Sequence, residues 1–185
     1  IMAPKDEDEL RHMLYTGMQY NGPCAIRYPR GAGEGADRSS PLKKIPFAKG
    51  EDLNEGSDIA IFAIGTMVRP ALDAAISLAR KGIRAAVINM RYVSPLDEEV
   101  IIKWAKRCGR VITIEENILS GGFGSAVLEL LEREQLNHVQ KKCLGIPTAF
   151  IEHGNRQTLL DLYGLNSDSI YRVASSLCML RVKEA

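Results

Sequence analysis

From residue 58 onward, two patterns of apolar and polar positions follow one another along the chain. Nearly continuous apolar runs, of which residues 58–64 are the first, are typical of strands that are covered on both faces. Between these runs apolar residues recur every three or four positions, which predicts amphipathic helices. Because strands and helices alternate, the pattern predicts an α/β fold: a mainly parallel sheet with helices on both faces. Strands are expected at 58–64, 85–90, 110–115 and 141–146, with an edge strand at 47–53, and helices at 69–81, from 94 onward, and at 125–134, 156–163 and 167–180.

Capping residues set the expected ends of these helices. Gly82 lies where the first helix needs a left-handed C-terminal residue. Ser94, Pro95 and Asp97 match a helix start in which Ser94 is the N-cap, Pro95 the first helical residue and Asp97 the closing residue of a capping box. The second helix of the series is therefore expected to begin at Ser94.

The first residues of the chain are organised differently. Asp6 and Glu9 match a capping box at the start of a helix. A short strand is expected from Cys24 to about Tyr28, and residues 31–46 are rich in Gly, Ser, Pro and charge, as is typical of a linker. The predicted boundary separates residues 1–45 from a domain at 46–185. The first helix is expected to carry an apolar face made of Leu10, Met13, Leu14 and Met18.

The charge balance bears on partners. Twenty-four Lys and Arg residues against 23 Asp and Glu residues leave a net charge of +1, which gives no support for a nucleic-acid or membrane-surface partner. No apolar run approaches the roughly 18 residues of a membrane span, and we expect no signal peptide. The chain begins with Ile1 rather than methionine, so we expect it to be a piece of a longer protein.

The cysteines and histidines are scattered. Cys24, Cys108, Cys143 and Cys178 lack the spacing of a zinc or redox motif, so they are expected to be buried or inert thiols in a reducing compartment, the cytoplasm. The histidines are also far apart, and no metal-ligating spacing exists among them. They are His12, His138 and His153.

The stretch CAIRYPRG, residues 24–31, has two arginines at the end of the expected strand. Ligands of open α/β sheets gather at the carboxyl ends of strands, and a guanidinium fork suits phosphate or carboxylate, so Arg30 is a candidate binding residue. In the structural alternative, Arg27 pairs with an acid such as Glu7 or Glu9, and Arg30 is solvated beside the linker. Spacing alone favours this alternative. The glycines that follow open no helix, which indicates flexibility rather than a phosphate loop.

Residues 115–125, EENILSGGFGS, form a second candidate site between an expected strand and an expected helix. Glu115 and Glu116 could do acid–base chemistry, and the glycines could let the backbone approach a ligand. The glycine order does not match a dinucleotide loop, which favours a tight turn whose carboxylates cap or accept backbone amides. His153 could be a base, but no Ser or Cys nucleophile is evidently paired with it, which favours an interface or capping role.

Several longer stretches resemble one family. They are MAPKDEDELRHMLYT at 2–16, AIRYPRG at 25–31, IGT at 64–66, NMRYVSPLD at 89–97, TIEEN at 113–117, GGFG at 121–124 and LYGL at 162–165. Together they resemble the 1-deoxy-D-xylulose-5-phosphate synthase family over essentially the whole chain, and RYPRG is the most specific of them.

The resemblance implies a three-domain transferase that uses thiamine diphosphate and magnesium (Mg2+). Such enzymes condense pyruvate with glyceraldehyde 3-phosphate, release carbon dioxide, and supply isoprenoid, thiamine and pyridoxal synthesis. Residues 1–45 would be the tail of the pyrimidine-binding domain plus a linker, and residues 46–185 the transketolase-type C-terminal domain. Arg30 matches the arginine that holds the phosphate of the triose, whereas Arg27 is left a structural role.

The catalytic, cofactor-binding and metal-binding residues of the family are implied to lie outside this chain. The chain is therefore expected to bind no cofactor, to be inactive alone, and to self-associate, for example as a homodimer. Two alternatives remain: the C-terminal domain of another transketolase-like or 2-oxo acid dehydrogenase enzyme, or a non-catalytic α/β binding module.

Overall fold

The computed structural model describes residues 1–31, 33, 35–37 and 39–179. Within these residues the strands form a five-stranded sheet in the order β1-β3-β2-β4-β5. The parallel strands are β2 (Ile59–Ala63), β3 (Ala85–Asn89), β4 (Arg110–Ile118) and β5 (Gln140–Ile146). At one edge, β1 (Glu51–Asn54) pairs antiparallel with β3. The predicted α/β class is confirmed, and the edge strand is shorter than the 47–53 stretch proposed for it.

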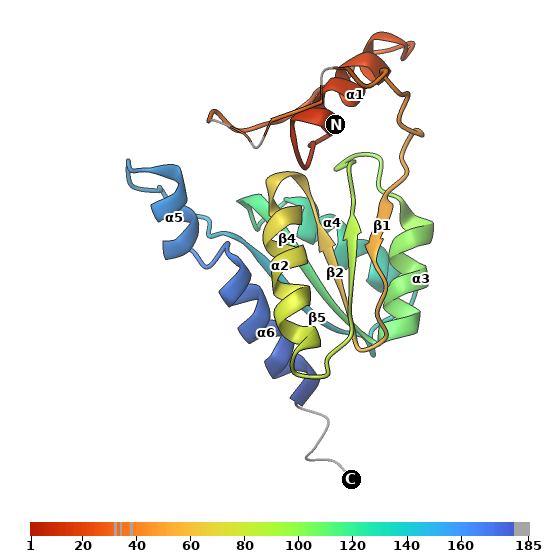
Figure 1. Ribbon diagram of the computed structural model, residues 1–185. Coiled ribbons are helices and arrows are strands. Elements are labelled where there is room, and N and C mark those ends of the chain that lie inside the picture. Colours follow the sequence, from red (N-terminus) through yellow and green to blue (C-terminus); the bar gives the residue numbers. More distant parts are fainter. Residues whose placement is uncertain (32, 34, 38, 180–185) are drawn as a thin grey trace.

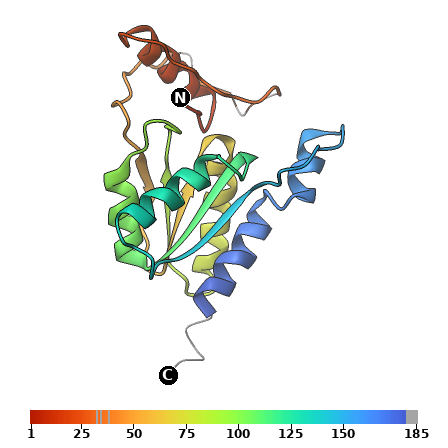
Figure 2. The same ribbon diagram turned by 180° about the vertical axis from the view of Figure 1, so that it is seen from behind.

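Helices cover both faces of the sheet (Figures 1 and 2). On one face lie α2 (Val68–Ala79) and α6 (Ser167–Met179), and on the other α3 (Glu98–Cys108) and α4 (Phe123–Arg133). Ile59 and Ile61 point into the core beneath α2 and α6, while Phe62 points into the core beneath α3 and α4. The apolar runs are continuous because each strand is buried on both sides. The predicted end of the last helix at residue 180 lies outside the described residues.

The predicted start of α3 at Ser94 is wrong. The helix begins at Glu98, and Asp97 is its N-cap, accepting a hydrogen bond from the N–H of Val100 at 3.3 Å. The second carboxylate oxygen of Asp97 accepts the N–H of Gly50 at 3.0 Å, and the side chain is buried. A contact with the segment before β1 therefore favours Asp97 over Ser94 as the cap, which no local pattern could reveal.

The N-terminal segment, which contains α1, lies over the carboxyl ends of the parallel strands (Figure 1). Its helix α1 (Glu7–Met18) begins at the predicted cap, with the carboxylate of Asp6 accepting the N–H of Glu9 at 2.7 Å. The Glu9 half of the predicted capping box is wrong, because its carboxylate accepts the N–H of Lys5 instead. The strand expected at 24–28 is reduced to one parallel bridge between Ile26 and Met2, and Met2 also bridges to Tyr92 beyond β3. The N–H of Ala3 donates to the carbonyl of Arg91 at 2.9 Å, so the segment is joined directly to the loop after β3.

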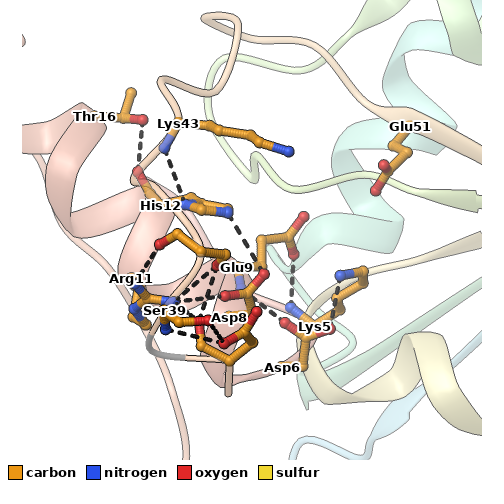
Figure 3. A network of polar contacts seen from close by, with 12 residues as sticks. Lys5, Asp6, Asp8, Glu9, Arg11, His12, Thr16, Ser39, Lys43 and Glu51 are labelled. Atoms are coloured by element: carbon orange, nitrogen blue, oxygen red, sulfur yellow. Dashed lines mark hydrogen bonds and ion pairs between the residues drawn. The ribbon is translucent and has the colours of Figure 1, made fainter.

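The described part of the predicted linker is bonded to α1. Arg11 Nη2 donates to the carbonyl of Ser40 at 3.1 Å, and the N–H of Lys43 donates to His12 Nδ1 at 3.2 Å. Figure 3 shows the contact between Lys43 and His12 at one side of the helix. Asp37 and residues 39–45 thus run back along α1, bonded to it at several points.

The apolar face predicted for α1 is only partly covered. Met13 is fully buried and packs with Met2, Ile45 and Tyr92. Leu14 and Met18, on the same helix, leave 51% and 88% of their surface exposed. The helix therefore has a seam that holds it to the domain and an outer apolar side with no cover in the described chain.

All four cysteines are free, as predicted. Cys24 is exposed rather than buried, whereas Cys108 is buried. Burial raises the pKa of Cys108 to about 11, so this thiol stays protonated and unreactive at neutral pH. No helix of the described chain is long and apolar enough to cross a membrane.

Candidate functional site

The carboxyl ends of β2 and β4 meet at the topological switch point of the sheet, because β3 lies on one side of β2 and β4 on the other. Ligands of open α/β sheets bind at such points. Thr66, which follows β2, and Glu116, near the end of β4, line a cleft of about 280 Å³ there. Its opposite wall is Arg27, Tyr28 and Pro29, so the RYPRG motif covers the switch point.

A larger cleft of about 600 Å³ adjoins the first, and both are lined by Pro4, Tyr28, Pro29 and Thr66. Its walls come from the N-terminal segment, α2 and the start of α5 (Arg156–Leu162). Two acidic side chains, Asp6 and Glu7, also line it. The basic lining residues outnumber these acids, which suits an anionic ligand; they are Lys5, Arg30, Arg69 and Arg156.

Arg30 lines this larger cleft and is exposed to solvent. No hydrogen bond or ion pair joins its guanidinium to another of the described residues. By contrast, Lys5 is held by Asp6 at 2.7 Å and Arg156 by Glu116. Among the described residues that line the cleft, Arg30 thus offers a full set of donors to a ligand. Its predicted role in substrate binding stays a prediction.

Arg27 lies on the other side of the RYPRG motif, in the smaller cleft. Its Nη2 donates to the main-chain carbonyl of Glu116 at 2.6 Å. The proposed pairing of Arg27 with Glu7 or Glu9 is therefore wrong, because the partner is a carbonyl at the end of β4. In the structure, Arg27 joins the RYPRG motif to β4 through this hydrogen bond rather than through an ion pair.

Glu116 is the centre of a side-chain cluster that sequence reasoning missed. Arg156 donates through Nε to Glu116 Oε1 at 2.7 Å and through Nη2 to Oε2, and the hydroxyl of Thr66 donates to Oε2 at 3.0 Å. Arg156 is the first residue of α5, where the helix dipole disfavours a cation. That unfavourable location was the only sequence signal of an acidic partner.

Glu115 accepts backbone amides, the role that the sequence favoured for it. Its side chain is buried, and its two carboxylate oxygens accept the N–H groups of Phe123 and Gly124 at 2.8 and 2.7 Å. Burial raises the pKa of Glu115, and the two N–H groups and the charge of Arg27 offset part of that rise. Because the amides at the start of α4 are already occupied by this carboxylate, the GGFG loop cannot cradle a phosphate in this arrangement.

A second buried cluster joins α1 to the sheet. Glu9 is 3% exposed, and its Oε1 accepts from Asn89 Nδ2 at 2.8 Å and from Arg91 Nε at 2.7 Å. Its Oε2 accepts the N–H of Lys5 at 2.8 Å. Arg91 Nη2 also lies 2.8 Å from Glu51 Oε2, an ion-pair contact without hydrogen-bond geometry. This cluster holds the start of α1 against the carboxyl end of β3, beside the clefts. No sequence pattern indicated it.

The histidines do not form a site. His153 is exposed in the loop before α5, His138 is exposed after α4, and His12 is engaged with Lys43. Within the described ranges, no three His, Cys, Asp or Glu side chains come close enough together to hold a metal ion. Glu116 and Glu9 are already paired with Arg156 and Arg91. The described residues therefore do not fit a magnesium-bound diphosphate.

The fold and this edge of the sheet agree with a known family. The model of the transketolase C-terminal domain matches residues 48–170. The chain belongs to the transketolase C-terminal domain family. The strands, the switch point, Glu116 and Arg156 all lie within the matched range, whereas Arg27 and Arg30 precede it.

Curated relatives extend the likeness of this transketolase-family chain to the N-terminal segment. A protein named 1-deoxy-D-xylulose-5-phosphate synthase from Heliobacterium modesticaldum is 51% identical over 177 residues, which is 96% of this chain and 27% of the relative. One named 1-deoxy-D-xylulose-5-phosphate synthase 1 from Geobacter sulfurreducens is 55% identical over 92% of this chain and 27% of the relative. The resemblance inferred from the sequence is confirmed, and the chain spans about a quarter of the length of these relatives.

A solved structure is similar to this chain over nearly its whole length. The chain is similar to one described as "Split gene transketolase, inactive beta4 tetramer", with a TM-score of 0.85 and 32% identity. The match covers 97% of this chain and 57% of that one. The arrangement of N-terminal segment and transketolase-type domain therefore recurs in a second protein.

Proposed function

We propose that this chain is part of a thiamine diphosphate-dependent transferase of the 1-deoxy-D-xylulose-5-phosphate synthase type. Such an enzyme condenses pyruvate with glyceraldehyde 3-phosphate, releases carbon dioxide, and supplies precursors of isoprenoids, thiamine and pyridoxal. The names of relatives that are 51% and 55% identical support this assignment. The free thiols support a cytoplasmic location.

In this proposal Arg30 binds the phosphate of the triose. The observation that carries it is the guanidinium of Arg30 in the larger cleft, which has no hydrogen bond or ion pair with another of the described residues. A phosphate dianion accepts two parallel N–H bonds from one guanidinium, and such charge-assisted bonds are stronger than neutral ones. The walls of this cleft carry more basic than acidic side chains, which lowers the cost of bringing in a dianion.

Thiamine diphosphate would supply the carbanion chemistry, and its ligands and those of magnesium would lie outside residues 1–185. The role of this chain is then to bind the acceptor substrate through Arg30 and to support the assembly. We accordingly propose that the chain alone neither binds the cofactor nor catalyses the condensation.

The change Arg30→Ala tests the binding role in the complete synthase, meaning the longer polypeptide to which we propose residues 1–185 belong. The KM for glyceraldehyde 3-phosphate is expected to rise roughly 10–100-fold, because a charge-assisted bond is lost. The KM for pyruvate should change by less than about 2-fold, because pyruvate carries no phosphate. Arg30→Lys should fall between the two, since an ammonium is a point charge rather than a fork.

The matched control is Arg84→Ala, which removes an exposed arginine located before β3, at the opposite end of the sheet. The chain alone is the negative control and should release no carbon dioxide from pyruvate. Equal losses for both substrates in Arg30→Ala would contradict a phosphate-binding role, as would an unchanged KM for the triose phosphate.

We also propose that the chain self-associates through the outer side of α1, as part of an oligomer in the complete protein. Leu14 and Met18 are exposed there, and Tyr20, just after the helix, is also exposed and stacks on the half-exposed ring of Phe47. A contiguous apolar surface of this kind favours a partner. The word "tetramer" in the description of the similar split-gene chain supports a second copy of the chain as that partner.

Light scattering after size-exclusion chromatography tests this proposal. The chain is expected to elute as an oligomer, and Leu14→Glu with Met18→Glu should shift it toward the monomer, since two buried charges would oppose assembly. Ile76→Glu is the control, because Ile76 is comparably exposed on α2, away from this surface. A strict monomer at high concentration, or an equal response to the control, would count against the proposal.

The similar split-gene transketolase also keeps a second candidate open, a transketolase-like transferase with another acceptor. A synthase should accept glyceraldehyde 3-phosphate together with pyruvate and release carbon dioxide. A transketolase should instead require a ketose donor and release none.

A further inference from the structure

The RYPRG motif is held to the rest of the molecule by few contacts. The N–H of Met2 donates to the carbonyl of Ala25 at 2.8 Å, and the N–H of Arg27 donates to the carbonyl of Met2 at 2.9 Å. Beyond Arg27, neither Tyr28 nor Arg30 makes a hydrogen bond to another residue of the described chain. The arginine that we propose binds phosphate therefore lies past the last main-chain anchor of its segment.

The side chain of Arg27 supplies a separate anchor at this point. Its Nη2 donates to the carbonyl of Glu116 at 2.6 Å, across 89 residues of sequence. This bond ties the motif to β4, whereas the main-chain bonds tie it to Met2. Because Arg27 is bound both at its main chain and at its side chain, the path of the residues that follow it, Tyr28 to Arg30, is constrained.

The acceptor of this bond is itself held in place. Glu116 lies within β4, and Arg156 and Thr66 bind its carboxylate. Its carbonyl falls in the stretch between Ile114 and Ile118 where the pairing of β4 with β5 is irregular, so it is free to accept from outside the sheet. Arg27 thus docks on a fixed point at the end of a central strand.

We infer that Arg27 is a positioning residue that acts through Arg30: by docking on the Glu116 carbonyl it orients the Arg30 guanidinium for the phosphate of the substrate. This inference rests on the proposed function. Arg27 lines the smaller cleft with its Nη2 engaged at the Glu116 carbonyl, whereas Arg30 lines the adjoining larger cleft, so we assign the phosphate to Arg30 and the positioning role to Arg27. A binding group works best when its neighbours hold it near the productive geometry, and a displacement of about 1 Å can cost two orders of magnitude.

A double-mutant cycle in the complete synthase tests the inference. Arg27→Met keeps the aliphatic part of the side chain but removes the donor, and it should raise the KM for glyceraldehyde 3-phosphate roughly 10-fold with the KM for pyruvate nearly unchanged. Arg27→Lys, which keeps a donor, should recover part of the loss. Because Arg27 acts only through Arg30, Arg27→Met should add nothing in an Arg30→Ala background. Arg84→Met is the control for removing an exposed arginine.

The outcomes separate the two proposals. If Arg30→Ala raises the KM for the triose phosphate but Arg27→Met does not, the positioning role is wrong and the proposed function stands. Multiplicative effects of the two changes would also overturn it, because Arg27 would then act independently of Arg30. If Arg30→Ala leaves this KM unchanged, the proposed function fails and the positioning role fails with it.

A second measurement needs no catalysis and uses the 185-residue chain itself. Arg27 is exposed, so Arg27→Met should leave the fold intact. The NMR order parameter of the Arg30 backbone amide should fall toward the flexible range, below about 0.6, in Arg27→Met and stay at its original value in Arg84→Met. Equal order parameters for Arg30 in the original chain and in Arg27→Met would overturn the inference.

Discussion

Replacing Glu9 with alanine should lower the free energy of unfolding by about 3–5 kcal/mol, the range for removing one partner of a buried ion pair. Glu9 is 3% exposed and accepts bonds from the fully buried Asn89 and from Arg91. Without the carboxylate, Asn89 Nδ2 has no partner and Arg91 keeps only its contact with Glu51. Water cannot readily replace a partner in so closed a position, so the lost bonds are not compensated.

Urea unfolding followed by circular dichroism measures this effect. Glu132→Ala is the matched control, because Glu132 is an exposed glutamate of α4, and its loss should change stability by less than about 0.5 kcal/mol. Glu9→Gln should be milder than Glu9→Ala, since one oxygen can still accept. If Glu9→Ala and Glu132→Ala were equally stable, the cluster would not hold α1 to the sheet.

Replacing Trp104 with alanine should cost about 3–5 kcal/mol of unfolding free energy, because it empties a large site in the core. Trp104 is fully buried between α3 and the sheet. Its Nε1 donates to Asp52 Oδ1 at 2.7 Å, which joins α3 to β1. The ammonium of Lys103 and the guanidinium of Arg107 lie 4.8 and 4.7 Å from the ring centroid and cover its outer side.

Trp104→Phe separates packing from hydrogen bonding. It keeps most of the ring volume and loses the bond to Asp52, so about 1–2 kcal/mol is expected. Because Trp104 is the single tryptophan of the chain, unfolding of both variants must be followed by circular dichroism rather than fluorescence. Ile76→Ala, at a half-exposed site of α2, is the control and should be nearly neutral. A loss below 1 kcal/mol for Trp104→Ala would contradict this assignment of the core.

The α/β core could be predicted because each of its elements carries its own signal. The run at 58–64 became β2, and the helical spacing at 69–81 became α2, which is followed by Gly82 with a φ of 76°. Burial on both faces of a strand requires continuous apolar sequence, and a left-handed position after a helix favours glycine. These requirements are local, so the sequence alone reveals them.

Predictions failed where a distant residue competes with a local one. Ser94 has a suitable side chain for an N-cap, but the N–H of Gly50 and the start of α3 both bind Asp97. The strand expected at 24–28 is reduced because its partner is the single residue Met2 rather than a full strand. In both cases the deciding partner lies more than 20 residues away.

The candidate site divides in the same way. The sequence by itself determined the fold class, the location of Arg30 beyond the end of an extended stretch, and the role of Glu115 as an acceptor of backbone amides. These features depend on the spacing of apolar residues, on proline and glycine, and on amide donors nearby in the sequence, all of which act within a few residues. Only the tertiary structure decided that Arg27 binds the carbonyl of Glu116, that Arg156 neutralises its carboxylate, and that Glu9 is buried against Arg91. The physical reason is that ion pairs and side-chain hydrogen bonds depend on distances in space, and a sequence does not indicate which of its 24 basic residues will meet which acid.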